Sequence, residues 1–264
     1  MYRASGRHGL RFWQRREPLN QQWYDKLIRN GKGFKPLYLK AGLEQCIDLQ
    51  IVQQQGWLPQ DKHAAILEIG PGDGRVIDYL RKLGYDNITA VENHPKIFKV
   101  LKQKYADDTG VKLILSDIRN YQPSTLFSTA LWLWCGIDEI PKEQQGSAIQ
   151  HMMSMVLANG VFVYDTPTKD GESNVTITHE KSHRNGTYNA ELQNDDTVFR
   201  AYLPTRDELQ QTLATLKEQG TLANYKILSY QTATSRERVL SACFPGPQLR
   251  SSLRARREGP GARL

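Results

Sequence analysis

The chain has 264 residues, which is enough for one α/β domain with additional segments at its ends. Hydrophobic residues make up 39% and charged residues 24%, as is typical of a globular protein with a sizeable core. No apolar run approaches the roughly 20 residues of a membrane helix, and the first residues lack the apolar segment of a secretory signal. We therefore expect neither a membrane protein nor a secreted one.

The three cysteines, Cys46, Cys135 and Cys243, lie far apart in the sequence. Their spacing argues against a Cys-x-x-Cys zinc site and a dense disulfide framework, and it favours a reducing compartment. We therefore expect a cytoplasmic protein. Residues 1–17 carry five arginines and no acid before Glu17, as mitochondrial transit peptides do, so the mitochondrial matrix is the alternative.

The net charge of +7 is concentrated at the two ends of the chain. Residues 1–40 carry +8 and residues 249–264 carry +4, whereas residues 41–248 carry −5. A nucleic-acid enzyme usually has a basic surface beside its active site, and here only the N-terminal segment could supply one. The composition predicts three parts: a basic arm with a short helix (1–40), a main domain (41–245) and a basic, disordered tail (246–264).

Helical and strand patterns alternate through the first two thirds of the chain. Two helices, at 20–29 and about 43–55, come first, with breakers at Gly31, Gly33 and Pro36 between them. Strands are then predicted at 64–69, 88–91, 111–115, 129–135 and 161–164, and helices between them at 75–83, 97–105 and 143–157. This alternation predicts right-handed crossovers and a doubly wound, mostly parallel sheet with helices on both faces.

The pattern changes after the fifth strand. Short β segments at 175–178, 187–192 and 198–203 form a β insert over about 174–203. A helix follows at 205–219, with Thr205 as its N-cap and Glu208 three residues on. Two further strands are predicted at 225–232 and 238–244.

One strand end carries the chemically most informative motif, Gly70-Pro71-Gly72-Asp73-Gly74. Glycines here allow a tight turn and a close approach of the backbone to a ligand at the N-terminus of the next helix. A dinucleotide fingerprint requires G-x-G-x-x-G, but Arg75 stands where its last glycine would fall. A P-loop requires a lysine that the sequence lacks. Both phosphate-binding interpretations are thereby weakened.

The segment from Glu68 to Gly74 resembles the first motif of class I (Rossmann-like) S-adenosylmethionine-dependent methyltransferases, and the resemblance covers about residues 60–245. It implies a seven-stranded sheet with an antiparallel last strand, and S-adenosyl-L-methionine as the cofactor. Glu92 would accept hydrogen bonds from the ribose hydroxyls, Asp117 would bind the adenine amino group beside the Ile118 backbone, and Trp134 would lie near the methionine part. The implied cofactor-binding residues are Glu68, Gly70, Gly72, Gly74, Glu92, Asp117, Ile118 and Trp134. The alternative for Glu92 and Asp117 is a helix-capping or surface role.

His179-Glu180-Lys181-Ser182-His183 matches the H-E-x-x-H signature of zinc proteases. That signature needs a helix, because only there do the two histidines share a face at this spacing. The preceding β-branched residues favour a strand, and the following Arg-Asn-Gly favours a turn. Asn189 also stands where a third histidine ligand would be needed. We therefore expect a polar β-hairpin and no metal site.

Methyl transfer depends largely on proximity and alignment, so a recognisable catalytic dyad is not required. The acceptor should lie above the ends of the fourth and fifth strands. Candidate residues there are Trp134, Asp138, Glu139, Tyr164 and Asp165, with Arg200 or Tyr202 from the β insert and Tyr24 closing over the cofactor. Core packing is the alternative for Trp134 and Tyr164, and a solvated loop for Asp138 and Glu139. His94 and His151, on predicted helices, are expected to be surface or hydrogen-bonded histidines rather than bases.

The sequence after the fourth strand, Trp-Cys-Gly-Ile-Asp-Glu, lacks the Asn/Asp-Pro-Pro-Tyr motif of amino-methylating relatives, and the paired glutamates of the protein-arginine branch are not apparent. The β insert followed by Pro204–Leu209 resembles small-molecule N- and O-methyltransferases. We therefore expect N- or O-methylation of a small molecule. One alternative is a protein or RNA methyltransferase that uses the basic arm, and another is a non-catalytic cofactor-binding partner subunit.

Overall fold

The computed structural model describes residues 20–29, 33–171, 176–183, 185–194 and 197–246. The basic segment 1–17 and nearly all of the predicted tail lie outside these ranges, and the division of the chain at residues 40 and 245 stays a prediction. No helix within the described ranges is long and apolar enough to span a membrane.

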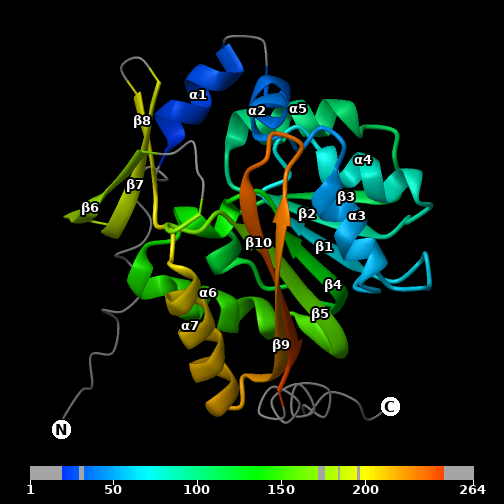
Figure 1. Cartoon of the computed structure of the whole chain (residues 1–264). Helices are drawn as coiled ribbons and strands as arrows, with labels where there is room; N and C mark the ends of the chain where they lie inside the picture. The colour runs from blue at the N-terminus through cyan, green and yellow to red at the C-terminus, as the bar shows by residue number, and fades with distance from the viewer. Residues whose placement is uncertain (1–19, 30–32, 172–175, 184, 195–196, 247–264) are drawn as a thin grey trace, which may run out of the picture.

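A seven-stranded sheet forms the centre of the molecule, with the order β3-β2-β1-β4-β5-β10-β9 (Figure 1). Its strands are β1 (Ile66–Ile69), β2 (Ile88–Glu92), β3 (Val111–Leu115), β4 (Phe127–Trp132), β5 (Val156–Thr166), β9 (Leu222–Gln231) and β10 (Glu237–Pro245). The first five strands run parallel, and β10 is antiparallel to both β5 and β9. The predicted sheet with an antiparallel last strand is confirmed.

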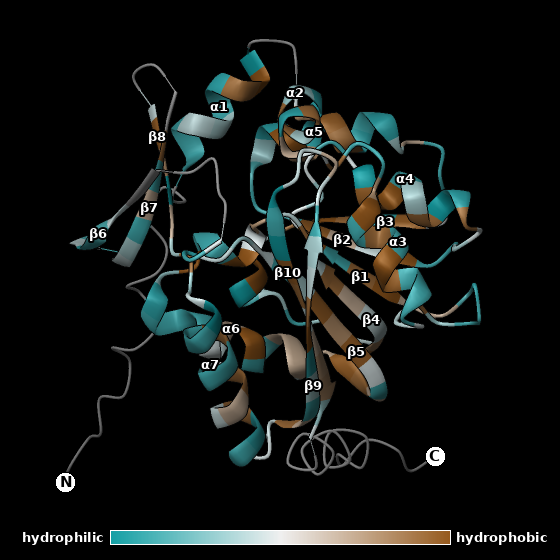
Figure 2. Ribbon diagram, viewed as in Figure 1, coloured by the Kyte–Doolittle hydropathy of each residue, from teal (hydrophilic) through white to brown (hydrophobic). Residues whose placement is uncertain are grey.

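Helices cover both faces of this sheet, as predicted. On one face lie α3 (Ile47–Gln54) and α4 (Arg75–Lys82), and on the other lie α6 (Lys142–Met153) and α7 (Arg206–Glu218). The central strands are buried on both sides, which explains their nearly continuous apolar sequences (Figure 2). The capping box at Thr205 and Glu208 is present at the start of α7. α5 (Pro95–Lys104) follows β2 and packs against β3.

The β insert forms a separate antiparallel sheet of β6 (Thr176–His183), β7 (Gly186–Asn194) and β8 (Thr197–Ala201). The helix α1 (Gln21–Arg29) packs against β8 and α5, as Figure 1 shows at the top of the molecule. Trp23 is the buried anchor of α1 and contacts Phe199 on β8. The N-terminal helix and the insert therefore meet on the same side of the sheet.

Several predicted boundaries were wrong. Pro36 does not break the chain but begins a helix, α2 (Lys35–Ala41), because proline fits the first helical turn, where no amide hydrogen bond is lost. The helix predicted at 143–157 ends at Met153, and β5 begins at Val156 instead of residue 161. An apolar run of this length does not distinguish a buried helix from a strand. The fourth strand ends at Trp132, before the predicted Cys135.

Candidate active site

The glycine loop connects β1 to α4 and needs backbone angles that only glycine adopts without strain. Gly70, Gly72 and Gly74 have φ angles of 64°, 60° and 90°. A Cβ atom at Gly70 would meet nothing within 4 Å, so open space lies beside the loop. A Cβ atom at Gly74 would lie 2.1 Å from the Tyr105 hydroxyl, which donates a hydrogen bond to the Gly74 carbonyl. Gly74 is therefore needed for packing at the helix start, whereas Gly70 and Gly72 face a cavity.

Glu68 lies in β1 beneath the loop and is only 2% exposed. One of its carboxylate oxygens has no hydrogen-bond partner among the described residues. Burial raises the pKa of Glu68 to about 8, against the opposing effect of Arg75. Glu68 lines neither of the cavities described below, so it supports the loop from within the core.

Glu92 ends β2 and places a buried carboxylate beside the loop. One oxygen accepts the His94 backbone N–H at 2.7 Å, which fixes the side chain. Burial raises the pKa of Glu92 to about 7, while hydrogen bonds from backbone amides lower it. His94 itself is buried, caps the start of α5 by accepting from Ile97 and lies 3.1 Å from Asp25. It is a hydrogen-bonded histidine, as expected, but not a surface one.

Asp117 follows β3 and caps the short helix η1 (Ile118–Asn120). Its carboxylate also forms an ion pair with Arg119, with atoms 2.6 Å apart. Burial raises the pKa of Asp117, but hydrogen bonding to Arg119 outweighs it, so the pKa is lowered overall. The Ile118 carbonyl contacts Nε2 of His151 at 3.0 Å. Asp117 therefore has the capping role that was the alternative interpretation, while it still lines the cavity.

The segment after β4 leaves the sheet through two non-glycine residues with left-handed backbones. Trp134 and Cys135 have φ angles of 63° and 66°, a conformation that costs about 1–2 kcal/mol per residue. The Trp134 N–H donates to a carboxylate oxygen of Asp165, which offsets this cost. The turn leads into η2 (Gly136–Glu139) and places the Trp134 side chain in the wall of two cavities.

The first cavity, here called the cofactor pocket, lies at the carboxyl ends of β1 to β4. That edge of an open α/β sheet is where ligands bind. Of the eight predicted cofactor residues it is lined by Gly70, Gly72, Glu92, Asp117, Ile118 and Trp134, and not by Glu68 or Gly74. Tyr24, Phe34 and Tyr38 from the N-terminal helices also line it.

Glu139 enters the cofactor pocket from η2 and contacts α1. It accepts hydrogen bonds from the Tyr24 hydroxyl at 2.5 Å and from the Asn20 side-chain amide at 3.0 Å. Burial raises the pKa of Glu139 to about 7, and both of these hydrogen bonds lower it. Glu139 is therefore a buried, partnered carboxylate rather than part of a solvated loop.

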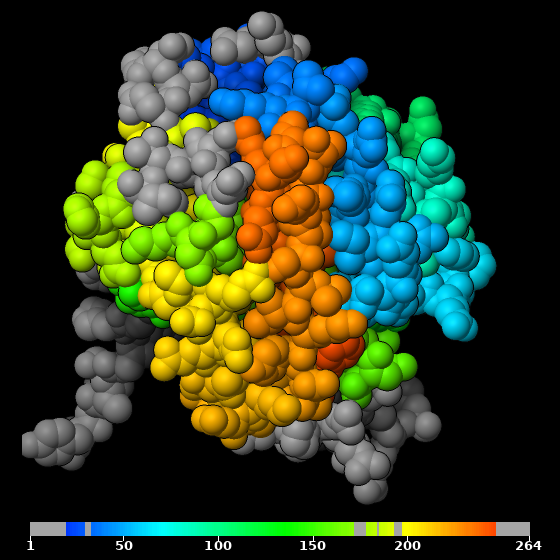
Figure 3. Space-filling model, in the orientation of Figure 1, coloured from blue at the N-terminus to red at the C-terminus, as the bar shows by residue number. Residues whose placement is uncertain are grey.

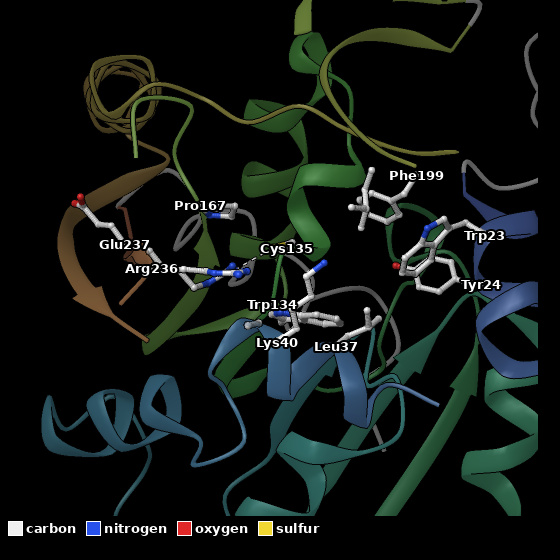
Figure 4. A pocket seen from close by; sticks show the side chains of 13 residues that line it. Trp23, Tyr24, Leu37, Lys40, Trp134, Cys135, Pro167, Phe199, Arg236 and Glu237 are labelled. Atoms are coloured by element: carbon white, nitrogen blue, oxygen red, sulfur yellow. Dashed lines mark hydrogen bonds between the residues drawn. The ribbon is translucent and has the colours of Figure 1, made fainter. Parts of the chain in front are cut away.

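The second cavity, here called the acceptor pocket, is shown in Figure 4. Tyr24 and Trp134 line both cavities. The other lining residues are Trp23, Leu37, Lys40, Ala41, Cys135, Pro167, Leu192, Phe199, Arg236, Glu237 and Arg238. Most of its wall is apolar or aromatic, and its charged side chains come from α2 and from the start of β10.

Three of the predicted acceptor residues line neither pocket. Tyr164 packs in the core, which was its alternative interpretation. Asp138 is fully buried, and Thr166 donates to it at 2.6 Å. Asp165 is also fully buried and accepts hydrogen bonds from Tyr230 at 3.0 Å and from Arg238 at 2.6 Å. Asp165 thus holds the Trp134 backbone and the Arg238 side chain in place from behind the pocket wall.

The β insert contributes residues other than those expected. Arg200 and Tyr202 line neither pocket, and Tyr202 instead donates to Glu208 at 2.9 Å. Leu192 and Phe199 reach the acceptor pocket from β7 and β8. Phe199 lay in a predicted strand, but no pattern in the sequence indicated which of its faces meets the site.

The H-E-x-x-H segment lies in strand β6, which pairs with β7 in the predicted hairpin. In a strand, residues four apart lie roughly 13 Å from each other, too far to share one metal ion. Asn189, at the position of the third ligand, is buried and exchanges two hydrogen bonds of 2.8 Å with the Leu203 backbone. The motif is therefore part of a structural hairpin.

The sequence pointed to neither Arg236 nor Arg238. Both lie at the junction of the loop after β9 with β10, far from the glycine motif in the chain. The sequence did contain one signal for Arg238, because it is a charged residue at the start of an otherwise apolar predicted strand. Arg238 is only 6% exposed, and a buried charge in a strand needs a partner, here Asp165.

Comparison with known proteins agrees with this architecture. Residues 66–160 match a family model described as a methyltransferase domain. DhpI in its SAH complex has a TM-score of 0.59 and 15% identity, with 86% of this chain and 96% of that chain covered. DesVI of Streptomyces venezuelae also has a TM-score of 0.59, with 12% identity and coverage of 82% and 98%.

A third solved structure, the glycopeptide N-methyltransferase MtfA complexed with S-adenosyl-L-homocysteine, has a TM-score of 0.53 and 13% identity, with 74% and 88% covered. No curated protein matches the sequence. At these identities the structural likeness concerns the fold, and the methyltransferase-domain model matches the half of the sheet that carries the glycine loop, Glu92 and Asp117. Residues 66–160 therefore match a methyltransferase domain, and the chain has the fold of solved S-adenosylmethionine-dependent methyltransferases.

Proposed function

We propose that the chain methylates a nitrogen or oxygen atom of a small molecule bound in the acceptor pocket. The observation that carries this proposal is the wall formed by Tyr24 and Trp134, which both pockets share. Because both residues line both pockets, a methyl donor in the cofactor pocket and an acceptor in the acceptor pocket would meet beside them. Holding two reactants in the correct orientation can supply much of the acceleration of a displacement reaction.

The residues of the cofactor pocket fit S-adenosylmethionine. Open space beside Gly70 lets the backbone approach a ligand. The buried Glu92 carboxylate would accept hydrogen bonds from the ribose hydroxyls. Ile118 and Trp134, which line the same pocket, would contact the adenine and methionine parts. When bound, the cofactor would supply a methyl group on a positively charged sulfur, which leaves as the thioether of S-adenosylhomocysteine when an acceptor lone pair takes the methyl carbon.

The surroundings of the acceptor pocket favour a small molecule. Its wall comes from α1, α2, the β insert and the start of β10, so the acceptor is surrounded by separate segments of the chain. A polymer would need an open groove instead. Residues 41–248, which include the main domain, also carry −5, which is unfavourable for RNA.

The test uses tritiated S-adenosylmethionine with the low-molecular-weight, protein and RNA fractions of a cell extract. We expect label to enter the low-molecular-weight fraction. Leu37→Trp, which fills the acceptor pocket without touching the cofactor pocket, should abolish labelling and keep affinity for S-adenosylhomocysteine. Lys226→Gln, on the exposed face of β9, is the matched control and should behave as wild type.

Labelling confined to the protein or RNA fraction would contradict a small-molecule acceptor. S-adenosylhomocysteine binding without labelling of any fraction would favour a non-catalytic subunit. Labelling that persists in Leu37→Trp would remove the acceptor-pocket assignment and leave the cofactor pocket intact.

A further inference from the structure

The acceptor pocket has one aromatic end. Trp23, Tyr24 and Phe199 contact one another there, with ring centroids 5.2 to 6.1 Å apart. In Figure 4 these rings lie on the opposite side of the pocket from Arg236, with Trp134 between them. An aromatic or otherwise apolar body fits this end, because it replaces water against the rings.

The other end of the acceptor pocket carries excess positive charge. Lys40, Arg236 and Arg238 line it together with a single acid, Glu237. Arg238 is neutralised by Asp165 at 2.6 Å, and Glu237 pairs with Arg206 at 2.5 Å, outside the pocket.

Neither Lys40 nor Arg236 has a carboxylate oxygen within 4.0 Å among the described residues. Desolvation, and then the nearby Arg238, lower the pKa of Arg236. The Arg236 guanidinium is therefore a partly buried cation without a counter-ion among the described residues. A bound anion would stabilise it.

The position of Arg236 is fixed by the loop between β9 and β10. The Thr232 N–H donates to the Arg236 carbonyl at 2.9 Å and closes the loop. The Ala233 N–H donates to the Gly42 carbonyl at 3.1 Å, which attaches the loop to the end of α2. A Cβ atom at Gly42 would lie 2.6 Å from the Thr234 backbone nitrogen, so only glycine permits this contact.

This contact holds together two cations that are almost 200 positions apart in the chain. Lys40 comes from the last turn of α2, two positions before Gly42, and Arg236 comes from the loop seated on Gly42. Figure 3 shows the orange β9–β10 hairpin against the blue segment that contains α2. Both side chains line the same end of the acceptor pocket, so an anionic ligand bound there would meet two cations.

We propose that the methyl acceptor is an aromatic or apolar molecule with an anionic group, a carboxylate, sulfonate or phosphate, which Arg236 binds with help from Lys40. This inference rests on the proposed function and specifies its substrate class. A guanidinium can donate two parallel hydrogen bonds to two oxygen atoms of such a group. With the anion at Arg236, the body of the acceptor lies along Trp134 toward the aromatic end, where the shared wall adjoins the cofactor pocket.

The test compares two fluorescent probes with one ring system: anilinonaphthalene sulfonate, and N-phenylnaphthylamine, which lacks the sulfonate. Both are titrated into protein saturated with S-adenosylhomocysteine. We expect the wild type to bind the sulfonate about tenfold more tightly than the neutral probe, the effect of one charge-assisted hydrogen bond. Arg236→Gln should remove this preference and leave the neutral probe's affinity unchanged, and Arg236→Lys should restore part of it.

Two further variants locate the probes and control for net charge. Leu37→Trp should weaken both probes, because it fills the pocket. Lys226→Gln removes the same charge outside the pocket and should keep the preference. Equal affinity of the two probes for the wild type, or a preference that survives Arg236→Gln, would overturn the inference.

Calorimetry with S-adenosylhomocysteine on each variant separates this inference from the proposed function. Wild-type protein that binds no S-adenosylhomocysteine overturns the proposed function. Protein that binds it with wild-type affinity and shows no preference for the anionic probe overturns only the proposed substrate class.

Discussion

The hydroxyl group of Tyr24 donates a hydrogen bond of 2.5 Å to Glu139, 115 positions away in the chain. Asn20 donates to the other carboxylate oxygen at 3.0 Å and also to the Arg200 carbonyl at 3.0 Å. These bonds attach α1 to η2 and to the β insert at the boundary of the two pockets. Both ligands would therefore contact a helix whose attachment depends on a few polar contacts.

Tyr24→Phe should loosen α1 in the ligand-free protein. A hydrogen bond to a carboxylate contributes about 1.5 kcal/mol or more, so we expect the α1 amides to exchange with deuterium about tenfold faster. Tyr79→Phe is the matched control. The Tyr79 hydroxyl, on the exposed side of α4, donates at 3.0 Å to Gln53 of α3. Unchanged exchange in α1 would show that other contacts hold the helix.

Glu92→Ala should weaken S-adenosylhomocysteine binding far more than Asp117→Ala. Glu92 would lose two charge-assisted hydrogen bonds from the ribose, each worth about 1.5–3 kcal/mol. The Asp117 carboxylate already pairs with Arg119, so its substitution should weaken binding of the ligand less. Calorimetry gives both dissociation constants. The control is Asp86→Asn, which changes an exposed ion pair with His63. Wild-type affinity in Glu92→Ala would contradict the assignment of the cofactor pocket.

The affinity for S-adenosylhomocysteine should increase as pH rises through about 7. Burial raises the pKa of Glu92 to about 7 in the ligand-free protein. Ribose hydroxyls donate to the ionised carboxylate, so binding favours the deprotonated form and weakens, by up to about tenfold per pH unit, below that pKa. Glu92→Gln should remove this slope.

Glu139 lines the same pocket, and burial also raises its pKa to about 7, so its contribution must be separated. Glu139→Gln should keep the dependence of affinity on pH. If the slope disappears in Glu139→Gln and persists in Glu92→Gln, the titrating group is Glu139 and the assignment to Glu92 is wrong.

The parts of the fold that could be predicted are those set by local patterns. The strand at Val111–Leu115 was predicted with its observed ends, because a turn precedes it and polar residues follow it. The junction between α6 and β5 was not, because the apolar run from Met152 to Val156 fits either element. There the pairing of Val156 with Phe127, a contact distant in sequence, determines the strand.

The same distinction applies to the two pockets. The glycine loop, Glu92 and Asp117 follow consecutive parallel strands, so topology alone brings them to one edge of the sheet. Arg236 and Phe199 reach the acceptor pocket through the docking of a hairpin loop on Gly42 and of the β insert on α1. Local sequence patterns do not encode such docking, which explains why Asp138 and Asp165 were expected in their place.

The stability of the ligand-free protein should fall as pH rises from about 4.5 to about 8, because Glu68 is buried. Burial raises its folded-state pKa from 4.5 to about 8, so the folded protein binds a proton that the unfolded chain releases in this range. That contribution is present at low pH and is lost as pH rises through the folded pKa. Urea unfolding should show a shallower decrease for Glu68→Gln, whereas Glu44→Gln, an exposed control, should follow the wild type. An identical slope in Glu68→Gln would contradict this role.

Gly74→Ala should destabilise the protein more than Gly84→Ala, although both glycines have nearly the same φ, 90° and 88°. Alanine at such a φ costs about 1–2 kcal/mol at either position. At Gly84 the new Cβ meets nothing within 4 Å, whereas at Gly74 it would lie 2.1 Å from the Tyr105 hydroxyl. The difference between the two variants in the free energy of unfolding therefore isolates the collision.

A double-mutant cycle with Tyr105→Phe tests that interpretation. This change removes the colliding oxygen, together with its hydrogen bonds to the Gly74 carbonyl at 3.0 Å and to Asp78 at 2.7 Å. Gly74→Ala should then cost about 1 kcal/mol less in the Tyr105→Phe background than in the wild type. Additive effects would mean that Tyr105 moves aside freely, and that the glycine is required at this helix start by its backbone angle alone.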